Sequence, residues 1–149
     1  MQIELKIPQQ IYRLVEKGIW PKSSDEANHQ HTKSLVPKDK LKEFAPDEDW
    51  IYFYPMPFKK ISDTLLDEGN FWNQWGAINQ INPELTFIIA DFGIGSDTCL
   101  ILDYRENIDT PSLYRLVRNN RDKDGNYWEK VSNNFGEFCA ITELNKLLL

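Results

Sequence analysis

Asp91-Phe92-Gly93 has the residue types for metal-assisted chemistry, because it spells the metal-binding triplet of protein kinases. In a kinase this triplet works together with a glycine-rich phosphate loop, a strand lysine and a His-Arg-Asp catalytic loop. None of these accompanies it in a chain of 149 residues, which is also too short for a kinase domain. The triplet therefore predicts no phosphoryl transfer.

Gly93-Ile94-Gly95 has the spacing that begins a phosphate-binding loop. A third glycine is missing, and the residues that follow predict a strand, whereas a phosphate cradle needs a helix N-terminus. Glycines between two strands supply positive φ or a close backbone approach. We therefore predict that Gly93 and Gly95 form a structural turn, with Ser96 or Asp97 bonding its backbone.

Residues 120–125 (Asn-Arg-Asp-Lys-Asp-Gly) match the first half of a calcium-binding loop. The second half fails, because the position that needs a bidentate glutamate holds Val131, and Glu129 comes two places early. Strand-forming residues precede the run where a calcium loop has a helix. A hairpin turn explains this run better than a calcium site does.

The histidines and cysteines give no catalytic or metal-binding pattern. His29 and His31 lie in a polar stretch without further ligands, and neither is near a plausible serine or cysteine nucleophile in the sequence. Cys99 and Cys139 sit among apolar residues and are predicted to be reduced core thiols. We predict no catalytic residue, no metal and no cofactor, and hence a protein that is not an enzyme.

Composition narrows the classes of partner. The net charge of −6 disfavours direct nucleic-acid binding, which depends on Lys and Arg, and it favours a basic protein partner. Aromatic residues make up 13% of the chain and include five Trp, a type that anchors protein interfaces. The chain has no apolar run that could span a bilayer and no signal-peptide pattern in Met1–Pro8, which predicts a cytoplasmic protein without a membrane partner.

The N-terminal half of the chain predicts both strands and helices. Alternation of apolar and polar residues indicates the strands, helical spacing of apolar residues indicates the helices, and Gly or Pro residues mark their ends. The predicted elements are a strand over 3–7, a helix from Ile11 that ends near Gly18, an exposed loop over 21–34, a helix over 36–44, a strand over 50–54, helical turns over 61–66 and a helical segment over 71–75.

The second half predicts an antiparallel meander. Strands are expected over 86–90, 98–104 and 113–118, with short connections and a turn over 120–126. A helix that begins near Phe135, capped by Ser132 or Asn133, should pack an apolar stripe on the sheet. The fold class is therefore α+β, with a central, mostly antiparallel sheet and helices packed against it, in a single domain over 1–149.

The central strands and the final helix carry a family resemblance. Residues 87–103 (Phe-Ile-Ile-Ala-Asp-Phe-Gly-Ile-Gly-Ser-Asp-Thr-Cys-Leu-Ile-Leu-Asp) resemble the signature of the SUKH superfamily, the group of the yeast Smi/Knr cell-wall regulator. Its pattern is an aliphatic strand, a Gly-x-Gly-Asp-like turn and a strand that ends in Asp. Its closing segment resembles Trp128, Val131, Ser132, Phe135 and Phe138. The likeness covers roughly residues 50–144; Ser96 is an insertion before Asp97, and residues 1–34 match little.

The resemblance implies a fold and a role. It implies an α+β fold with a largely antiparallel sheet, and it implies protein binding, since bacterial members are similar to immunity proteins that neutralise toxin domains, often nucleases, of polymorphic toxin systems. The family has no common catalytic residues to carry over. Gly93, Gly95 and Asp97 match its motif as a turn.

The sequence therefore predicts a non-catalytic immunity protein that binds a cognate basic toxin. Acidic residues should speed the encounter, and aromatic anchors should supply most of the affinity. The candidate contacts are Asp47, Glu48, Asp49, Asp97, Glu106 and Asp109. Two alternatives stay open. One is a regulatory or scaffolding module of the same fold, and the other is a small-molecule binder or enzyme that uses a cleft beside the Gly93–Asp97 turn.

Overall fold

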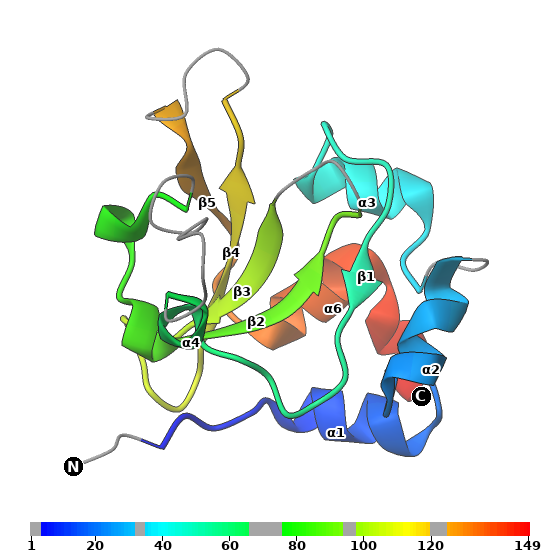
Figure 1. The fold of residues 1–149 in the computed structure, drawn as a ribbon. Coiled ribbons are helices and arrows are strands. Elements are labelled where there is room, and N and C mark those ends of the chain that lie inside the picture. Colours follow the sequence, from blue (N-terminus) through cyan, green and yellow to red (C-terminus); the bar gives the residue numbers. More distant parts are fainter. Residues whose placement is uncertain (1–3, 32–34, 66–75, 94–97, 120–124) are drawn as a thin grey trace.

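The computed structural model describes residues 4–31, 35–65, 76–93, 98–119 and 125–149. In these residues the chain adopts an α+β fold, with a five-stranded antiparallel open sheet and helices packed against it (Figure 1). The strands are neighbours in sequence order, which confirms the predicted meander. They are β1 (Tyr52–Phe53), β2 (Thr86–Asp91), β3 (Cys99–Asp103), β4 (Ser112–Val117) and β5 (Tyr127–Ser132).

Short helices fill the rest of the described chain. The α-helices are α1 (Gln9–Glu16), α2 (Ser24–Asn28), α3 (Lys38–Phe44), α4 (Ile61–Thr64) and α6 (Phe135–Thr142). The 3₁₀ turns are η1 (His29–His31), η2 (Ile78–Gln80), η3 (Pro83–Leu85) and η5 (Leu144–Leu148). No helix in the described ranges is long and apolar enough to cross a bilayer.

The sheet buries both of its faces, as the alternation along β3 shows. Leu100 and Leu102 belong to a core cluster built with α1, α3 and α6, on what we call the back face. Cys99 and Ile101 belong to a second cluster with α4, on the front face. Figure 1 shows α6 behind the sheet and α4 in front of it. All four side chains are buried, so β3 is the structural centre of the molecule.

A β-bulge in β2 decides which face its last residue uses. Ile88 pairs with Ile101 and Ala90 pairs with Leu100, so Ile89 is an extra residue on β2. Bulges break strand alternation and re-aim the side chains beyond them. Ile89 and Ala90 consequently both join the back cluster. Asp91, which pairs with Cys99, then points to the front face.

The segment 21–34, predicted to be an exposed loop, forms helices in its described part. The Ser23 hydroxyl accepts a hydrogen bond from the Glu26 amide at 3.3 Å, and the Glu26 carboxylate accepts one from the Lys22 amide at 2.6 Å. These local caps begin α2. The loop prediction was wrong over 24–31 because α2 buries no residue and so leaves no apolar period to read.

Two strand predictions also need correction, and one strand was missed. Residues 4–8 of the predicted N-terminal strand are irregular, and the predicted strand over 50–54 contracts to β1. β5 was not predicted at all. It is an edge strand with a bulge, because Leu113 pairs with Ser132 while Tyr114 pairs with Lys130, and Val131 is therefore unpaired. The bulge breaks the alternation that identifies a strand in a sequence.

Other predictions are confirmed. Gly18 follows α1 with a φ of +74°, and α3 buries Leu41 and Phe44. Cys99 and Cys139 are free and buried. The cap of α6 was misplaced, because the Asn134 side chain, rather than that of Ser132 or Asn133, accepts from the helix backbone. The predicted helical segment over 71–75 lies outside the described residues.

Candidate functional site

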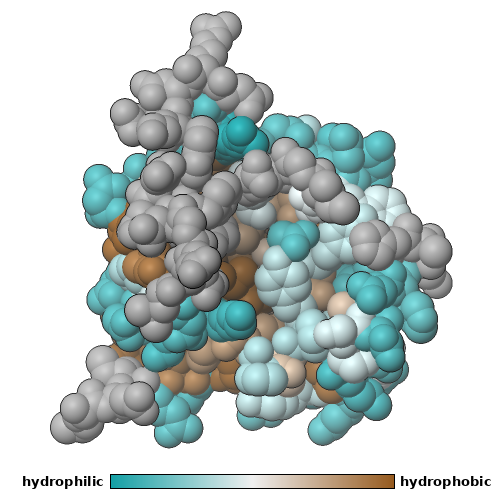
Figure 2. Space-filling model, in the orientation of Figure 1, coloured by the Kyte–Doolittle hydropathy of each residue, from teal (hydrophilic) through white to brown (hydrophobic). Residues whose placement is uncertain are grey.

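The edge of the sheet at β1 carries a row of aromatic side chains. Ile51 and Phe53 are fully buried in the back cluster. Trp50, Tyr52 and Tyr54 alternate with them and are half-buried. The rings of Trp50 and Tyr52 lie with their centroids 5.9 Å apart. We call Trp50, Tyr52 and Tyr54 the aromatic strip, and the part of the surface over β1 is pale in Figure 2, between hydrophilic and hydrophobic.

Asp91 lies beside this strip because of the β2 bulge. It is paired with Tyr52 across the two strands. Its Oδ2 accepts a short hydrogen bond from the Tyr54 hydroxyl, and its Oδ1 accepts one from the Gly93 amide at 2.9 Å. The carboxylate is thus fixed in position by one side chain and one backbone group.

Gly93 allows the ring of Tyr52 to pack against the turn after β2. Its φ is +96°, a conformation that L side chains rarely adopt. A Cβ atom at this position would lie 3.2 Å from Cε2 of Tyr52. Gly93 thus has the positive φ and the close approach expected of it, whereas the rest of the predicted turn, with Gly95 and Asp97, lies outside the described residues.

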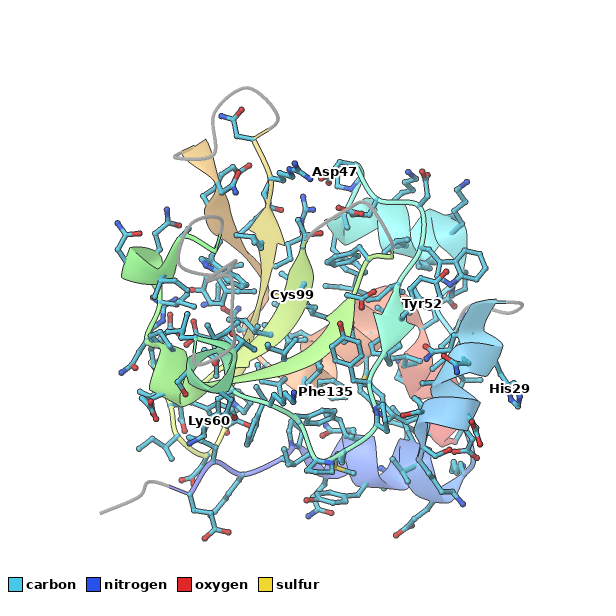
Figure 3. All side chains as sticks on the ribbon, in the orientation of Figure 1. His29, Asp47, Tyr52, Lys60, Cys99 and Phe135 are labelled. Atoms are coloured by element: carbon cyan, nitrogen blue, oxygen red, sulfur yellow. The ribbon has the colours of Figure 1, made fainter. Side chains whose placement is uncertain are left out.

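A pocket of about 420 Å³ lies between α2 and β1. We call it the edge pocket. Its size falls within the range of small-molecule and side-chain binding sites. Figure 3 shows Tyr52 on β1 and His29 on the outer side of the helical segment, pointing away. The polar and aromatic residues of the edge pocket are Ser24, Asn28 and Gln30 on the helical side, and Tyr52, Phe53, Tyr54 and Asp91 on the sheet side.

Gln30 closes the outer backbone edge of β1. Its amide nitrogen donates to the Phe53 carbonyl at 2.9 Å, and its amide oxygen accepts from the Phe53 N–H at 2.8 Å. The Trp50 indole in turn donates to the Gln30 carbonyl at 3.0 Å. Gln30 is only 4% exposed. The side-chain amide therefore takes the place of a further strand and blocks the edge against strand addition.

The electrostatics of the site oppose nucleophilic catalysis. Burial and the hydrogen bond to Asp91 raise the pKa of the Tyr54 hydroxyl, and burial, helped by Asp91, raises the pKa of the Cys99 thiol. Burial raises the pKa of Cys139 to about 12. Because their pKa values are raised, these groups stay protonated at neutral pH, whereas a reactive thiol has a lowered pKa. Among the described residues, no three His, Cys, Asp or Glu side chains are grouped to hold a metal ion. The arrangement can bind through rings and one carboxylate.

The acidic turn over 47–49, just before the aromatic strip, holds three of the predicted contacts. Asp47 lies 2.8 Å from Nη1 of the buried Arg115 (Figure 3 labels Asp47). Asp49 is largely exposed and accepts a hydrogen bond from Lys42 at 3.0 Å. Glu48 is only 8% exposed, and Thr98 donates to it at 3.3 Å. Burial removes Glu48 from the exposed acidic face on which it was predicted.

Two further predicted contacts lie at the opposite end of the sheet, in the connection between β3 and β4 (Figure 1). Glu106 pairs with Lys130 at 3.4 Å, and Asp109 pairs with Lys6 at 3.2 Å. The described acidic candidates therefore form two separate groups, each with basic neighbours. Only the acidic turn over 47–49 adjoins the aromatic strip.

Sequence reasoning missed the residues that build the edge pocket. The alternation of rings and aliphatic side chains over 50–54 was a visible signal for Tyr52 and Tyr54. Asp91 was considered as part of a kinase-like triplet and of the 87–103 resemblance, but not as a site residue, because its direction depends on a bulge that leaves no mark in the sequence. Gln30 contacts β1 only through tertiary folding, and the sequence contains no signal for that contact.

Comparisons of the chain with protein-family models, curated proteins and solved structures found no match. The resemblance to the SUKH superfamily accordingly stays a prediction from residues 87–103 and the closing segment. The fold itself is α+β, with a five-stranded antiparallel open sheet and helices packed against it.

Proposed function

We propose that this chain is a non-catalytic protein-binding domain of the immunity-protein type, which neutralises a basic toxin domain by binding it at the β1 edge. The observation that carries the proposal is the continuity of the acidic turn over 47–49 with the aromatic strip. Tyrosine and tryptophan anchors next to charged groups are typical of the centres of protein interfaces.

Charge supports a basic partner. The chain has a net charge of −6, although the described acidic candidates have basic neighbours. A net negative protein attracts a basic one over several ångströms and speeds their encounter, while the short-range ion pairs fix side chains in place. Positively charged surface is what a nuclease-type toxin uses to bind nucleic acid.

The blocked edge of β1 supports recognition by side chains. A partner that added a strand would need the N–H and C=O of Phe53, and Gln30 already occupies both. The raised pKa values of Cys99 and Tyr54 support binding over catalysis at this site.

The test uses the product of the reading frame immediately upstream of this one, which the proposal expects to carry a toxin domain. Purified protein should bind that domain and prevent its toxicity when the two are co-expressed. Replacing Tyr52 with Ala should weaken binding about tenfold or more, because the ring is an anchor. Tyr127→Ala is the matched control, since Tyr127 is an exposed tyrosine on the other edge strand.

Salt gives a second readout of the same experiment. The association rate should fall between about 50 mM and about 500 mM salt, because salt screens attraction between opposite charges. If the upstream product does not bind and remains toxic in the presence of this protein, the proposal is wrong. A conserved housekeeping partner in its place would favour the regulatory alternative.

A small-molecule binder is the second candidate, favoured by the edge pocket and its converging polar groups. Filling the pocket by Ala27→Trp should abolish ligand binding in an NMR screen. A ligand whose binding survives that substitution would exclude the edge pocket as its site.

A further inference from the structure

We infer that the edge pocket binds the guanidinium group of an arginine from the partner, with the Asp91 carboxylate pairing the charge and the ring of Tyr52 stacking on it. The inference rests on the proposed function, because it names the chemical group by which a basic partner would engage this edge.

The sheet already contains one site of this chemistry. Asp103 is the last residue of β3, as Asp91 is of β2. The Nε of Arg105 lies 3.0 Å and 2.8 Å from the two carboxylate oxygens of Asp103. Its guanidinium carbon lies 5.2 Å from the ring centroid of Tyr114, on the adjacent strand. A strand-end aspartate and a tyrosine from the next strand thus bind a guanidinium within this fold.

Asp91 shares two features of that arrangement, namely a carboxylate at the end of a strand and a tyrosine on the adjacent strand. Its paired residue on the adjacent strand is Tyr52, and Tyr54 fixes its carboxylate. Within the described ranges, no Lys or Arg side chain forms an ion pair with it. Each carboxylate oxygen of Asp91 accepts one hydrogen bond, which leaves each a further lone pair for a ligand. The edge pocket gives that ligand access.

Arginine fits this site better than lysine. A planar guanidinium can pair with both oxygens of a carboxylate and stack flat on an aromatic ring at the same time. An ammonium group is a compact, strongly hydrated charge that does only the first of these well. We therefore expect the site to bind arginine more tightly than lysine.

The test titrates the protein with N-acetyl-arginine methylamide and follows backbone amides by NMR. The lysine and citrulline analogues serve as probes that change the shape of the charge and remove it. The Gly93 amide reports directly, because it donates to Asp91. We expect saturable shifts of the Gly93 and Phe53 amides, with arginine bound more tightly than lysine and citrulline not bound.

Asp91→Asn should weaken arginine binding about tenfold or more, because it removes the charge. Its one amide oxygen can still accept from the Gly93 N–H, while its NH2 group can donate to the Tyr54 hydroxyl oxygen. Asp109→Asn, an exposed aspartate at the other end of the sheet, is the control that should bind like the parent. The absence of saturable shifts, or equal binding by the Asp91→Asn variant, overturns the inference. The proposed function fails separately, by loss of toxin binding, and Tyr52-dependent toxin binding without arginine binding would leave it standing.

Discussion

Asp91 connects several groups on the front of the β1 edge. It contacts the hydroxyl of Tyr54, bonds the turn at Gly93 and is paired with Cys99 across the strands. Its negative charge beside a buried thiol raises the cost of forming a thiolate there. A single carboxylate thus both lines the edge pocket and disfavours the thiolate form of Cys99.

The low reactivity expected of both cysteine thiols can be tested. Burial raises the pKa of Cys139 to about 12 and that of Cys99 further, so both remain thiols at about pH 8. Ellman's reagent should not react with the native protein on a timescale of minutes and should label both cysteines in denaturant. Fast labelling of native Cys99 would mean that its thiol is not buried in solution.

Gly93 should be more sensitive to a methyl group than Gly18. Both have positive φ, so alanine at either position costs about 1 kcal/mol of unfolding free energy. Only at Gly93 does the new Cβ meet a ring, that of Tyr52, whereas nothing lies within 4 Å at Gly18. Urea denaturation should show Gly93→Ala as the more destabilising by about a further 1 kcal/mol. Equal losses would mean that Tyr52 gives way without cost.

Among single residues, the sequence predicted those whose role is local. A glycine between two strand patterns indicates a turn, and two cysteines among apolar residues indicate a core. The carboxylate of Asp91 and the amide of Gln30 act through partners distant in the chain. Their roles depend on which strands become neighbours, and that information is absent from any short window.

At the scale of elements, both edges of the sheet are closed by glutamine side chains. Gln30 bonds the N–H and C=O of Phe53 on β1. Gln80 accepts from the Trp128 amide on β5 at 3.0 Å and donates to the Asn126 carbonyl at 3.3 Å. Gln30 thus satisfies both backbone groups of one β1 residue, whereas Gln80 satisfies one amide of β5 and the carbonyl just before that strand.

The two glutamines should differ in their contribution to stability. Gln30→Ala leaves a buried donor and acceptor of Phe53 unpaired and should cost about 2–3 kcal/mol of unfolding free energy. Gln80 is exposed, so water replaces its bonds in Gln80→Ala, and the loss should stay below about 1 kcal/mol. Urea denaturation measures both. A larger loss for Gln80→Ala would reverse this ranking.

The elements that the sequence predicted best are those with the most burial. β2, β3 and β4 are apolar and lie in the middle of the sheet, so their residue types alone identify them. α2 and β5 are polar and peripheral. α2 depends on capping by Ser23, and β5 depends on pairing with β4. Neither element has a hydrophobic period that could be detected in the sequence.

For the whole molecule, surface charges make stability depend on pH. The hydrogen bond from Lys42 lowers the pKa of Asp49, and the one from Lys146 lowers that of Glu143. A carboxyl whose pKa is lower in the folded state stabilises that state above its unfolded pKa and loses this effect as pH falls through the folded pKa. The urea concentration at the midpoint of unfolding should therefore be lower at about pH 3 than at about pH 5.

Carboxyl titration by NMR checks the assignment of this pH dependence. The folded-state pKa of Asp49 should rise towards its ordinary value in Lys42→Met, where the ammonium donor is lost. The pKa of Glu143, which faces Lys146 and Lys40, should not change. If Asp49 titrates identically in the parent and in Lys42→Met, the ion pair does not form in solution.

The hydrogen bonds of Gln30 and Gln80 at the two edges of the sheet also make these edges sensitive to deamidation during storage. Deamidation turns a side-chain amide into a carboxylate, which accepts a hydrogen bond but cannot donate one. Gln80 is exposed to water and Gln30 is buried, so hydrolysis reaches the β5 edge before the β1 edge. In an old preparation the bond from Gln80 to the Asn126 carbonyl would therefore be lost first, while the two bonds between Gln30 and Phe53 at the β1 edge would remain.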